Sequence, residues 1–194
     1  TIKAALIGFP TIESGGRCVS EIIASGIIPA GMEMMDKALI HATDDFVKAG
    51  YPRDAESMLI VELDGTETEV KELIEKVSAI AKKNKSSSIK ISKNEKQRMK
   101  FWAGRKAAFP ACGDMAPDYY CMDGTIPRGK LADVLKEIGR LSKKYNLPVA
   151  NAFHAGDGNL HPLIMYDANE KNSLEKTEKF GADILKYCVK MGGV

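Results

Sequence analysis

An Asp-Gly dipeptide near the end of the sequence constrains the fold more than any other feature. Asp157 and Gly158 stand between two strand-like segments. This pair is typical of a two-residue type I′ turn, in which both central residues have positive φ. Strands joined by such a turn are antiparallel neighbours. The sequence therefore predicts a β-hairpin here, and with it a sheet that is not purely parallel.

The predicted turn also sets a register. His154 and His161 lie symmetrically about it, so a two-residue turn places them opposite each other on one face of the sheet. Pro162 then lies opposite Phe153 at a non-hydrogen-bonded position, where its missing N–H does little harm. Two neutral imidazoles can chelate a metal ion, but a zinc site usually has three or four protein ligands. The alternative is a polar patch held by backbone hydrogen bonds, and the third histidine, His41, is too distant in sequence to be expected at the site.

The rest of the chain alternates between short strand patterns and longer helical patterns. Strands are expected over 3–10, 56–65, 87–92 and 118–127. Helices are expected over 14–26, 66–84, 94–111, 128–146 and 173–193. Thr66 followed by Glu69 forms a capping-box pattern at one helix start. A further helix is expected from Pro29, because proline suits a first turn and apolar residues then recur at helical spacing, at Met32, Met35, Leu39 and Phe46.

These elements predict an α+β fold. Strands joined by helices can also form a parallel sheet, but the hairpin and the short alternating strands favour a largely antiparallel sheet with helices packed on one face, ferredoxin-like in style. With 194 residues, 44% hydrophobic and 28% charged, the chain has the size and composition of one folded domain over 1–194.

The charge balance argues against two classes of partner. The chain has 28 basic and 26 acidic residues, so no nucleic-acid or membrane-surface partner is expected. Residues 82–100 hold eight basic residues and one acid, but no aromatic side chain on which a base could stack, and a solvated rim is favoured. No apolar run could span a bilayer, no signal segment opens the chain, and its four cysteines are scattered, so a cytoplasmic location with reduced thiols is expected.

Three motifs together resemble a known family. They are "HAGDGNLHP" over 154–162, "FWAGRKAAFPA" over 101–111 and "PDYYCMDGTIPR" over 117–128. The chain resembles the FAD-linked oxidases, which include the glycolate oxidase flavin subunit, D-lactate dehydrogenases and D-2-hydroxyglutarate dehydrogenases. "LIGFPT" and "IIPAGMEMMD" resemble the start of that family's C-terminal, substrate-side domain. The resemblance implies a flavoenzyme that oxidises a 2-hydroxy acid to the 2-oxo acid and passes the hydride to FAD.

The resemblance also implies ligands for a metal ion and for the cofactor. In metal-bearing members both histidines of the H-x-G-D-G-N-x-H motif bind a divalent ion, which implies His154 and His161 as ligands, with zinc favoured. Such an ion would lower the pKa of the substrate hydroxyl. Asn159 is implied to lie near the flavin edge, although asparagine also suits a plain turn.

The W-x-x-R motif implies a substrate-binding residue. Its arginine, Arg105 here, is implied to bind the substrate carboxylate, and a planar guanidinium suits that task because it can make two parallel hydrogen bonds. The alternative is a surface ion pair. Arg105 is expected to lean toward the strand that carries Tyr120 and Cys121, with Tyr120 as a second substrate-binding residue. D-2-hydroxyglutarate relatives carry lysine where this chain has Cys121, which favours a small monocarboxylic substrate such as glycolate or D-lactate.

Two departures from the family limit what the chain is expected to do alone. The family continues after the position of Val194 with a segment that supplies a third metal ligand and a base, and its FAD-binding domain precedes the matched region. We therefore expect this chain alone to be colourless and inactive, with no catalytic residue of its own and with an electron-acceptor subunit as a possible partner. The competing hypothesis is a non-catalytic ferredoxin-like module that binds a small carboxylate or a metal.

Overall fold

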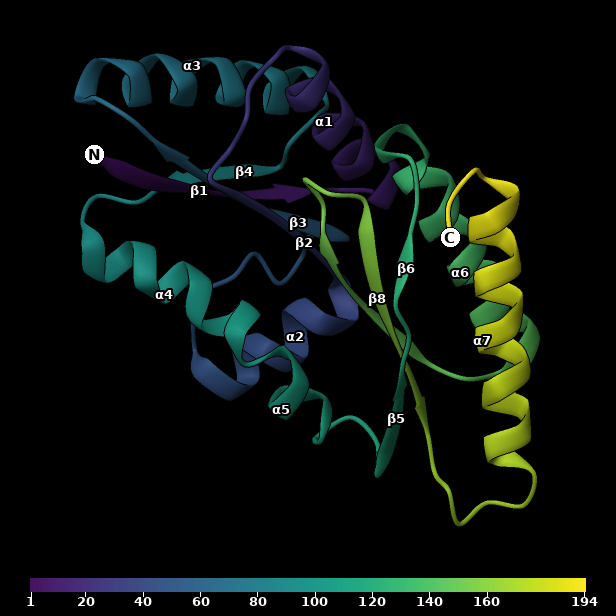
Figure 1. Ribbon diagram of the computed structural model, residues 1–194. Coiled ribbons are helices and arrows are strands. Elements are labelled where there is room, and N and C mark those ends of the chain that lie inside the picture. The colour runs from purple at the N-terminus through teal and green to yellow at the C-terminus, as the bar shows by residue number, and fades with distance from the viewer.

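The computed structural model describes residues 1–194 and contains one eight-stranded sheet (Figure 1). The strands are β1 Ile2–Phe9, β2 Gly31–Asp36, β3 Ser57–Asp64, β4 Ser88–Ile91, β5 Asp118–Cys121, β6 Gly124–Thr125, β7 Val149–His154 and β8 Asn159–Tyr166. Their order is β4-β1-β3-β2-β7-β8-β5, and β6 also pairs with β8. Every strand pairing is antiparallel, which confirms the predicted largely antiparallel sheet.

Seven α-helices and one 3₁₀ turn connect the strands. They are α1 Ile12–Ala24, α2 Lys37–Val47, α3 Glu67–Lys83, α4 Glu95–Lys106, α5 Ala108–Cys112, the 3₁₀ turn η1 Arg128–Lys130, α6 Leu131–Tyr145 and α7 Ser173–Lys190. In the first half of the chain, β1, β2, β3 and β4 form the part of the sheet with order β4-β1-β3-β2, and α1, α2 and α3 connect them in turn. This is the ferredoxin-like arrangement that was expected, extended beyond β2 by β7, β8 and β5.

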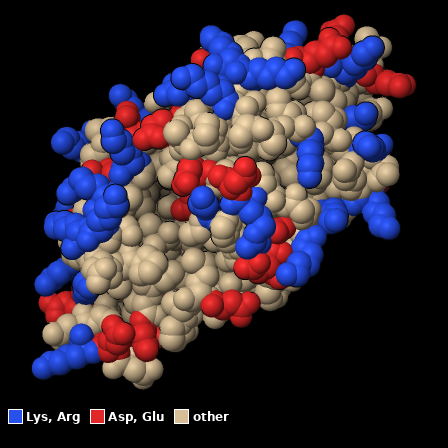
Figure 2. Space-filling view, turned by 180° about the vertical axis from the view of Figure 1, so that it is seen from behind, with Lys and Arg blue, Asp and Glu red and all other residues tan.

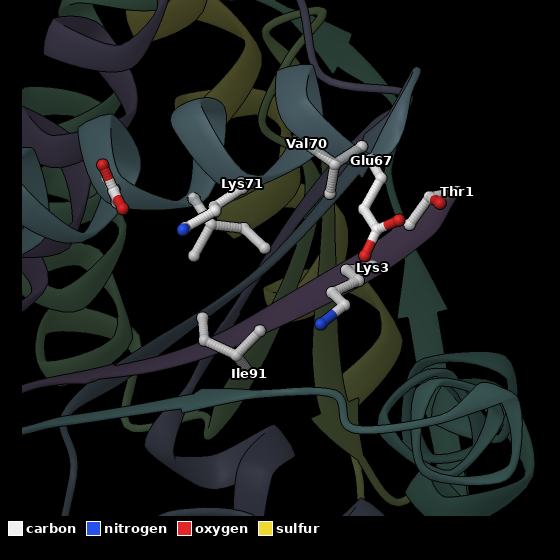
Figure 3. Close-up of a pocket in the computed structure, with 8 residues that line it drawn as sticks. Thr1, Lys3, Glu67, Val70, Lys71 and Ile91 are labelled. Atoms are coloured by element: carbon white, nitrogen blue, oxygen red, sulfur yellow. The ribbon is translucent and has the colours of Figure 1, made fainter.

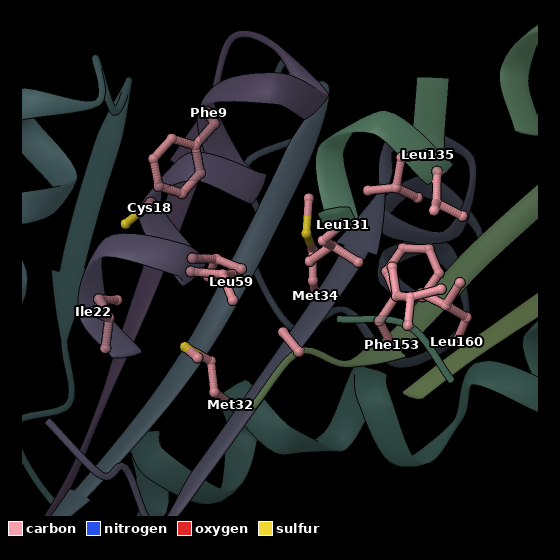
Figure 4. Packing of buried hydrophobic residues seen from close by; sticks show 14 of the residues in the cluster. Phe9, Cys18, Ile22, Met32, Met34, Leu59, Leu131, Leu135, Phe153 and Leu160 are labelled. Carbon is pink, nitrogen blue, oxygen red and sulfur yellow. The ribbon is translucent and has the colours of Figure 1, made fainter. Parts of the chain in front are cut away.

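Helices cover both faces of the sheet rather than one. One core lies beneath α1, α3, α6 and α7, and Figure 4 shows Phe9, Ile22 and Leu59 within it. A second core lies beneath α2, α4 and α5. The reason is the sequence of the central strands: in β1, Ala5 faces the first core and Leu6 the second, so both faces are apolar and both must be covered. The α+β class is confirmed, and the expectation of helices on one face is corrected.

The methionine segment after Pro29 is a strand, not a helix. β2 pairs with β3 on one side and β7 on the other, and the helix α2 begins only at Lys37, capped by Asp36. Met32 and Met34 enter the first core and Met35 the second, while Phe46 is half exposed. The apolar spacing suited either element over so short a run, and pairing with two neighbouring strands decided between them.

One other helix boundary differs from the prediction for a local reason. The helix expected over 94–111 divides at Ala107 into α4 and α5, because Pro110 cannot donate to the carbonyl four residues before it. The predicted capping box of Thr66 and Glu69 is present at the start of α3. No helix combines the length and the apolar character that a membrane span requires.

The basic segment over 82–100 is spread over three elements. It covers the end of α3, all of β4 and the start of α4. Arg98 from this segment pairs with Glu62 and Glu95. In the view of Figure 2, Lys and Arg side chains are spread over the surface with Asp and Glu side chains among them, and a group of both kinds lies near the centre. The segment is thus not one continuous basic face.

Candidate functional site

The predicted hairpin forms, but its loop is longer than expected. β7 and β8 are joined by the four residues 155–158, and His154 pairs with Asn159 while His161 pairs with Ala152. The direct opposition of the two histidines and the Phe153–Pro162 pairing are therefore wrong. Only Gly158 of the expected two-residue turn has positive φ.

Contacts from distant segments explain the longer loop. Gly158 accepts a hydrogen bond from the amide of Ile126 at 2.9 Å, and the amide of Gly156 donates to Met32 at 3.4 Å. A Cβ at position 158 would lie 2.2 Å from the carbonyl oxygen of Ile126. The loop is thus held by the strands beside it, which hairpin chemistry alone does not predict.

The two histidines nevertheless share one face of the sheet. The pairing differs from the expected one by two residues, and side chains alternate with a period of two, so the face is unchanged. The ring centroids of His154 and His161 are 5.0 Å apart with an interplanar angle of 89°. His161 Nδ1 also lies 3.9 Å from Asp123 Oδ1. No group of three or more His, Cys, Asp or Glu side chains is placed to hold a metal ion, so the histidines offer two ligands.

Glu33 joins this cluster, and it was not identified from the sequence. It lies on β2 directly opposite His154, and its Oε1 contacts His154 Nδ1 at 2.5 Å. The other oxygen, Oε2, accepts from Arg105 Nε at 2.8 Å. The signal that could have revealed it is the alternation Met-Glu-Met, which indicates a strand with one polar face once the segment is not taken as a helix.

Arg105 reaches the site from α4, but leans toward β2 rather than toward β5. Its side chain is 13% exposed, as is that of Glu33, so the pair is a largely buried one and not the surface ion pair considered as the alternative. Gly104 allows α4 to approach closely, because a Cβ there would lie 2.3 Å from the ring of Tyr51. The Tyr51 hydroxyl donates to the carbonyl of Phe101, which ties α4 to the rest of the second core.

Tyr120 is not brought to this site. On β5 it pairs with Ile164, packs against the first core and lies beside Gly181 of α7. Its neighbours Tyr119 and Cys121 pair with Met165 and Leu163, residues of the second core, and therefore share the face of the histidines. Both neighbours are exposed, and the Tyr119 ring lies 6.2 Å from that of Phe109.

Asn159 carries an acceptor without a partner. It lies between His154 on β7 and Thr125 on β6, and its Oδ1 is buried with no hydrogen bond. Buried polar atoms normally have a partner, so an orphaned acceptor beside the histidines suits a donor from a bound group.

Asp36 and Asn151 form a buried polar pair between β2 and β7. Asp36 Oδ2 accepts from the backbone and side-chain amides of Asn151 at 3.0 and 2.8 Å, and Oδ1 accepts from Leu39. Burial raises the pKa of the Asp36 carboxyl to about 6, although these hydrogen bonds oppose the rise. The pair links β2 to β7 beneath the site and caps α2.

The cysteines do not provide an activated thiol. Burial raises the pKa of Cys18 to about 12 and that of Cys112 to about 11. Cys121 is exposed, and partial burial together with the Asp123 carboxylate raises its pKa too. None of these thiols is favoured as a thiolate nucleophile at neutral pH.

A separate pocket lies far from the histidines. It has a volume of about 330 Å³ and is placed between β1, β4 and α3, on the face of the first core (Figure 3). Charged side chains of Lys3, Glu67 and Lys71 surround apolar groups of Val70 and Ile91. It shares no residue with the site around Glu33 and His154.

Comparison with curated proteins finds close relatives. Residues 1–194 match the family described as FAD linked oxidases, C-terminal domain. The glycolate oxidase subunit GlcD of Escherichia coli (strain K12) is 52% identical over 191 residues, 98% of this chain and 38% of the relative. GlcD of Bacillus subtilis (strain 168) is 33% identical over 100% of this chain and 41% of the relative. The mitochondrial D-lactate dehydrogenase (cytochrome) of Arabidopsis thaliana is 27% identical over 97% and 33%. The chain thus spans well under half the length of these relatives.

Solved structures share the fold at low identity. The 4-ethylphenol oxidase from Gulosibacter chungangensis has a TM-score of 0.71 and 13% identity, covering 100% of this chain and 45% of that chain. A p-cresol methylhydroxylase with bound substrate has a TM-score of 0.72 and 14% identity, covering 100% and 44%. At such identities the likeness concerns the fold alone.

Proposed function

Because this chain belongs to the FAD-linked oxidases as their C-terminal domain, we propose that it forms the substrate side of a flavin-dependent 2-hydroxy-acid oxidoreductase. The whole protein would oxidise the hydroxy acid to the 2-oxo acid and transfer the hydride to FAD. The observation that carries the proposal is Arg105, which is anchored through Nε to Glu33 beside two histidines. A guanidinium held in this way matches a substrate carboxylate.

The substrate carboxylate would bind to the outer edge of Arg105. Its Nε is the atom that bonds Glu33, and the two terminal nitrogens make no hydrogen bond within the chain. A fork of two donors can bind a carboxylate in bidentate geometry. Cys121 shares this face and offers no positive charge for a second carboxylate, which supports a small monocarboxylic acid such as glycolate or D-lactate.

His154 and His161 would hold a divalent metal ion, with zinc favoured. Two imidazoles on one face of the sheet, with ring centroids 5.0 Å apart, are close enough to bind one metal ion together after small side-chain rotations. When bound, the ion would lower the pKa of the substrate hydroxyl. Arg105 would meanwhile hold the carboxylate, and Asn159 would offer its free Oδ1 to the flavin edge.

The remaining parts would come from elsewhere in the whole protein. We propose that an FAD-binding domain precedes the matched region and that a third metal ligand and a base follow it. Val194 exchanges two backbone hydrogen bonds with Thr125, which lies opposite Asn159, so residues near this end of the chain are adjacent to the site. Four free cysteines support a cytoplasmic location, and the naming of GlcD as a subunit supports a partner subunit in the whole protein; we propose that this partner accepts the electrons.

A substrate screen of the full-length protein tests the proposal. Glycolate, D-lactate, L-lactate and D-2-hydroxyglutarate are supplied with a dye acceptor, and reduction of the bound flavin is followed in parallel. We expect turnover of a small monocarboxylic 2-hydroxy acid and poor turnover of the dicarboxylate. Absence of flavin, or reduction by none of these acids, would refute the proposed function.

A further inference from the structure

Glu33 connects two residues that reach the site from different elements. Met32 and Met34 of β2 enter the first core, so Glu33 between them faces the other side of the sheet. There one carboxylate oxygen contacts His154 of β7 and the other accepts from Arg105 of α4. Each oxygen serves one partner.

These two bonds determine which atoms of the partners remain available. With Nδ1 of His154 bonded to a carboxylate, Nε2 is the ring nitrogen that remains free to bind a metal ion. With Nε of Arg105 bonded, its terminal nitrogens are left as a fork. The His154 side chain is 43% exposed, whereas Glu33 and Arg105 are 13% exposed, so the carboxylate lies behind the ring and holds it from the interior.

A carboxylate is the group that this position requires. It accepts on both oxygens, whereas an amide has one acceptor oxygen and a donor nitrogen that would face a donor of the second partner. In a largely buried setting, hydrogen bonds between opposite charges are also stronger than on the open surface. Glutamate at this position can therefore set the orientation of both partners at once.

We propose that Glu33 is a positioning residue that sets the ring tautomer of His154 and the orientation of the Arg105 guanidinium together. The inference rests on the proposed function of those two residues. It assigns Glu33 no contact with substrate or cofactor. It predicts that metal binding and substrate binding are coupled through this one carboxylate.

The chain contains a matched control. Glu62 lies on the neighbouring strand β3, is 17% exposed in its side chain, and accepts from Arg98 and Trp102 of the same helix α4. Substitution of Glu62 therefore disturbs a similar buried contact with α4, but leaves both partners of Glu33 in place. Glu33→Gln and Glu62→Gln form the test pair.

Nitrogen NMR of the histidine rings reads the tautomer directly. This chain has three histidines, and His41 Nε2 contacts the Arg53 carbonyl, so it must donate there and provides the opposite tautomer as an internal reference. In the parent chain at a pH where the rings are neutral, we expect His154 to be protonated at Nδ1 and zinc to perturb its Nε2. In Glu33→Gln we expect mixed tautomers and roughly 10- to 100-fold weaker zinc binding. Glu62→Gln should stay within about twofold of the parent, as expected for a variant that leaves the ligand and its orienting group intact.

Steady-state kinetics of the full-length protein test the second partner of Glu33, which is Arg105. Glu33→Gln should raise KM for the monocarboxylic substrate more than Glu62→Gln does. Since one amide oxygen can serve one partner only, either the His154 signal or KM must change. Unchanged values for both, or equal losses in the two variants, would overturn the proposal.

The experiments remain decisive if Glu33→Gln fails to fold or if the proposed function is wrong. If Glu33→Gln does not fold, Glu33→Asp keeps the charge but is one methylene shorter, so it should still lose one of the two contacts and change the His154 signal or KM. Parent-like values for both in that variant would overturn the proposal. If the full-length protein oxidises no 2-hydroxy acid, the proposed function fails, while the His154 tautomer and zinc affinity of the chain still test Glu33.

Discussion

His154 and His161 lie on one face of the sheet with ring centroids 5.0 Å apart, although neither is the direct cross-strand partner of the other. With two ligands, we predict that zinc binding by this chain alone is weak. Calorimetric titration should give weak binding that His154→Ala abolishes. Tight binding that survives this substitution would place the metal elsewhere.

The buried Asp36 carboxyl predicts a pH dependence of stability. Its pKa is raised from 3.8 to about 6 in the folded state, so its contribution is complete below about pH 4 and is lost as pH rises through 6. The loss is at most about 3 kcal/mol. Thermal melts of the parent and Asp36→Asn should show the parent's relative stability falling between pH 4 and 6. A constant difference across this range would mean that Asp36 titrates normally.

The close contact between Gly104 and Tyr51 predicts that a larger side chain at position 104 would displace α4. In Gly104→Ala the new Cβ would overlap the Tyr51 ring, so α4 must shift and take Arg105 with it. Overpacking of this kind costs about 1–3 kcal/mol. Gly139 of α6 is exposed with open space around it, so Gly139→Ala should instead stabilise by up to about 1 kcal/mol. Chemical denaturation of both variants measures this, and equal effects would contradict the close packing of α4.

The cysteines predict a single reactive thiol. Cys121 is exposed, whereas Cys18, Cys112 and Cys188 are buried. A thiol reagent should modify one cysteine in the folded chain and four after denaturation, and Cys121→Ser should remove the one site that reacts in the folded chain. Its reaction should be slow at neutral pH because its pKa is raised. Rapid labelling of two or more thiols in the folded chain would show that one of the two cores opens, the first if Cys18 or Cys188 reacts and the second if Cys112 does.

The sequence predicted those parts of the fold that local chemistry controls. Asp157 and Gly158 indicated a hairpin, and the period of two kept both histidines on one face even though the loop is two residues longer. The register itself depended on bonds from Met32 and Ile126, which are distant in sequence. No local pattern contains that information.

The candidate site was predicted in part for the same reason. Motifs pointed to Arg105 and the histidines, and the Met-Glu-Met alternation could have marked Glu33 as polar-facing, but its contact with His154 follows only when β2 is placed beside β7, 121 positions further along the chain. Tyr120 shows the converse error. One strand was predicted over 118–127, where the structure has two short strands, β5 and β6. Which of the two adjacent tyrosines shares the sheet face of the histidines is decided by pairing with β8, and it is Tyr119.

The ion pair of Arg105 also changes what its substitution should do to folding. A partly exposed arginine would contribute little to stability, but here Arg105→Ala leaves the Glu33 carboxylate largely buried without its charged partner. Loss of a partner in such a pair destabilises by about 1–3 kcal/mol or more. Thermal melts should show this loss, with Arg105→Lys retaining part of the stability. A melting temperature equal to that of the parent would mean that Glu33 is satisfied by His154 alone.

Kinetics of Arg105 variants in the full-length protein test the central claim most directly. Loss of a charge-assisted contact to the substrate carboxylate should cost about 2–5 kcal/mol, roughly a thirtyfold to several-thousandfold fall in kcat/KM for Arg105→Ala. Arg105→Lys should recover only part of it, because an ammonium lacks the fork geometry. Assays are run at a temperature where melts show both variants to be folded. If folded variants oxidise 2-hydroxy acids as the parent does, the carboxylate is bound elsewhere and Arg105 only anchors α4 to the sheet.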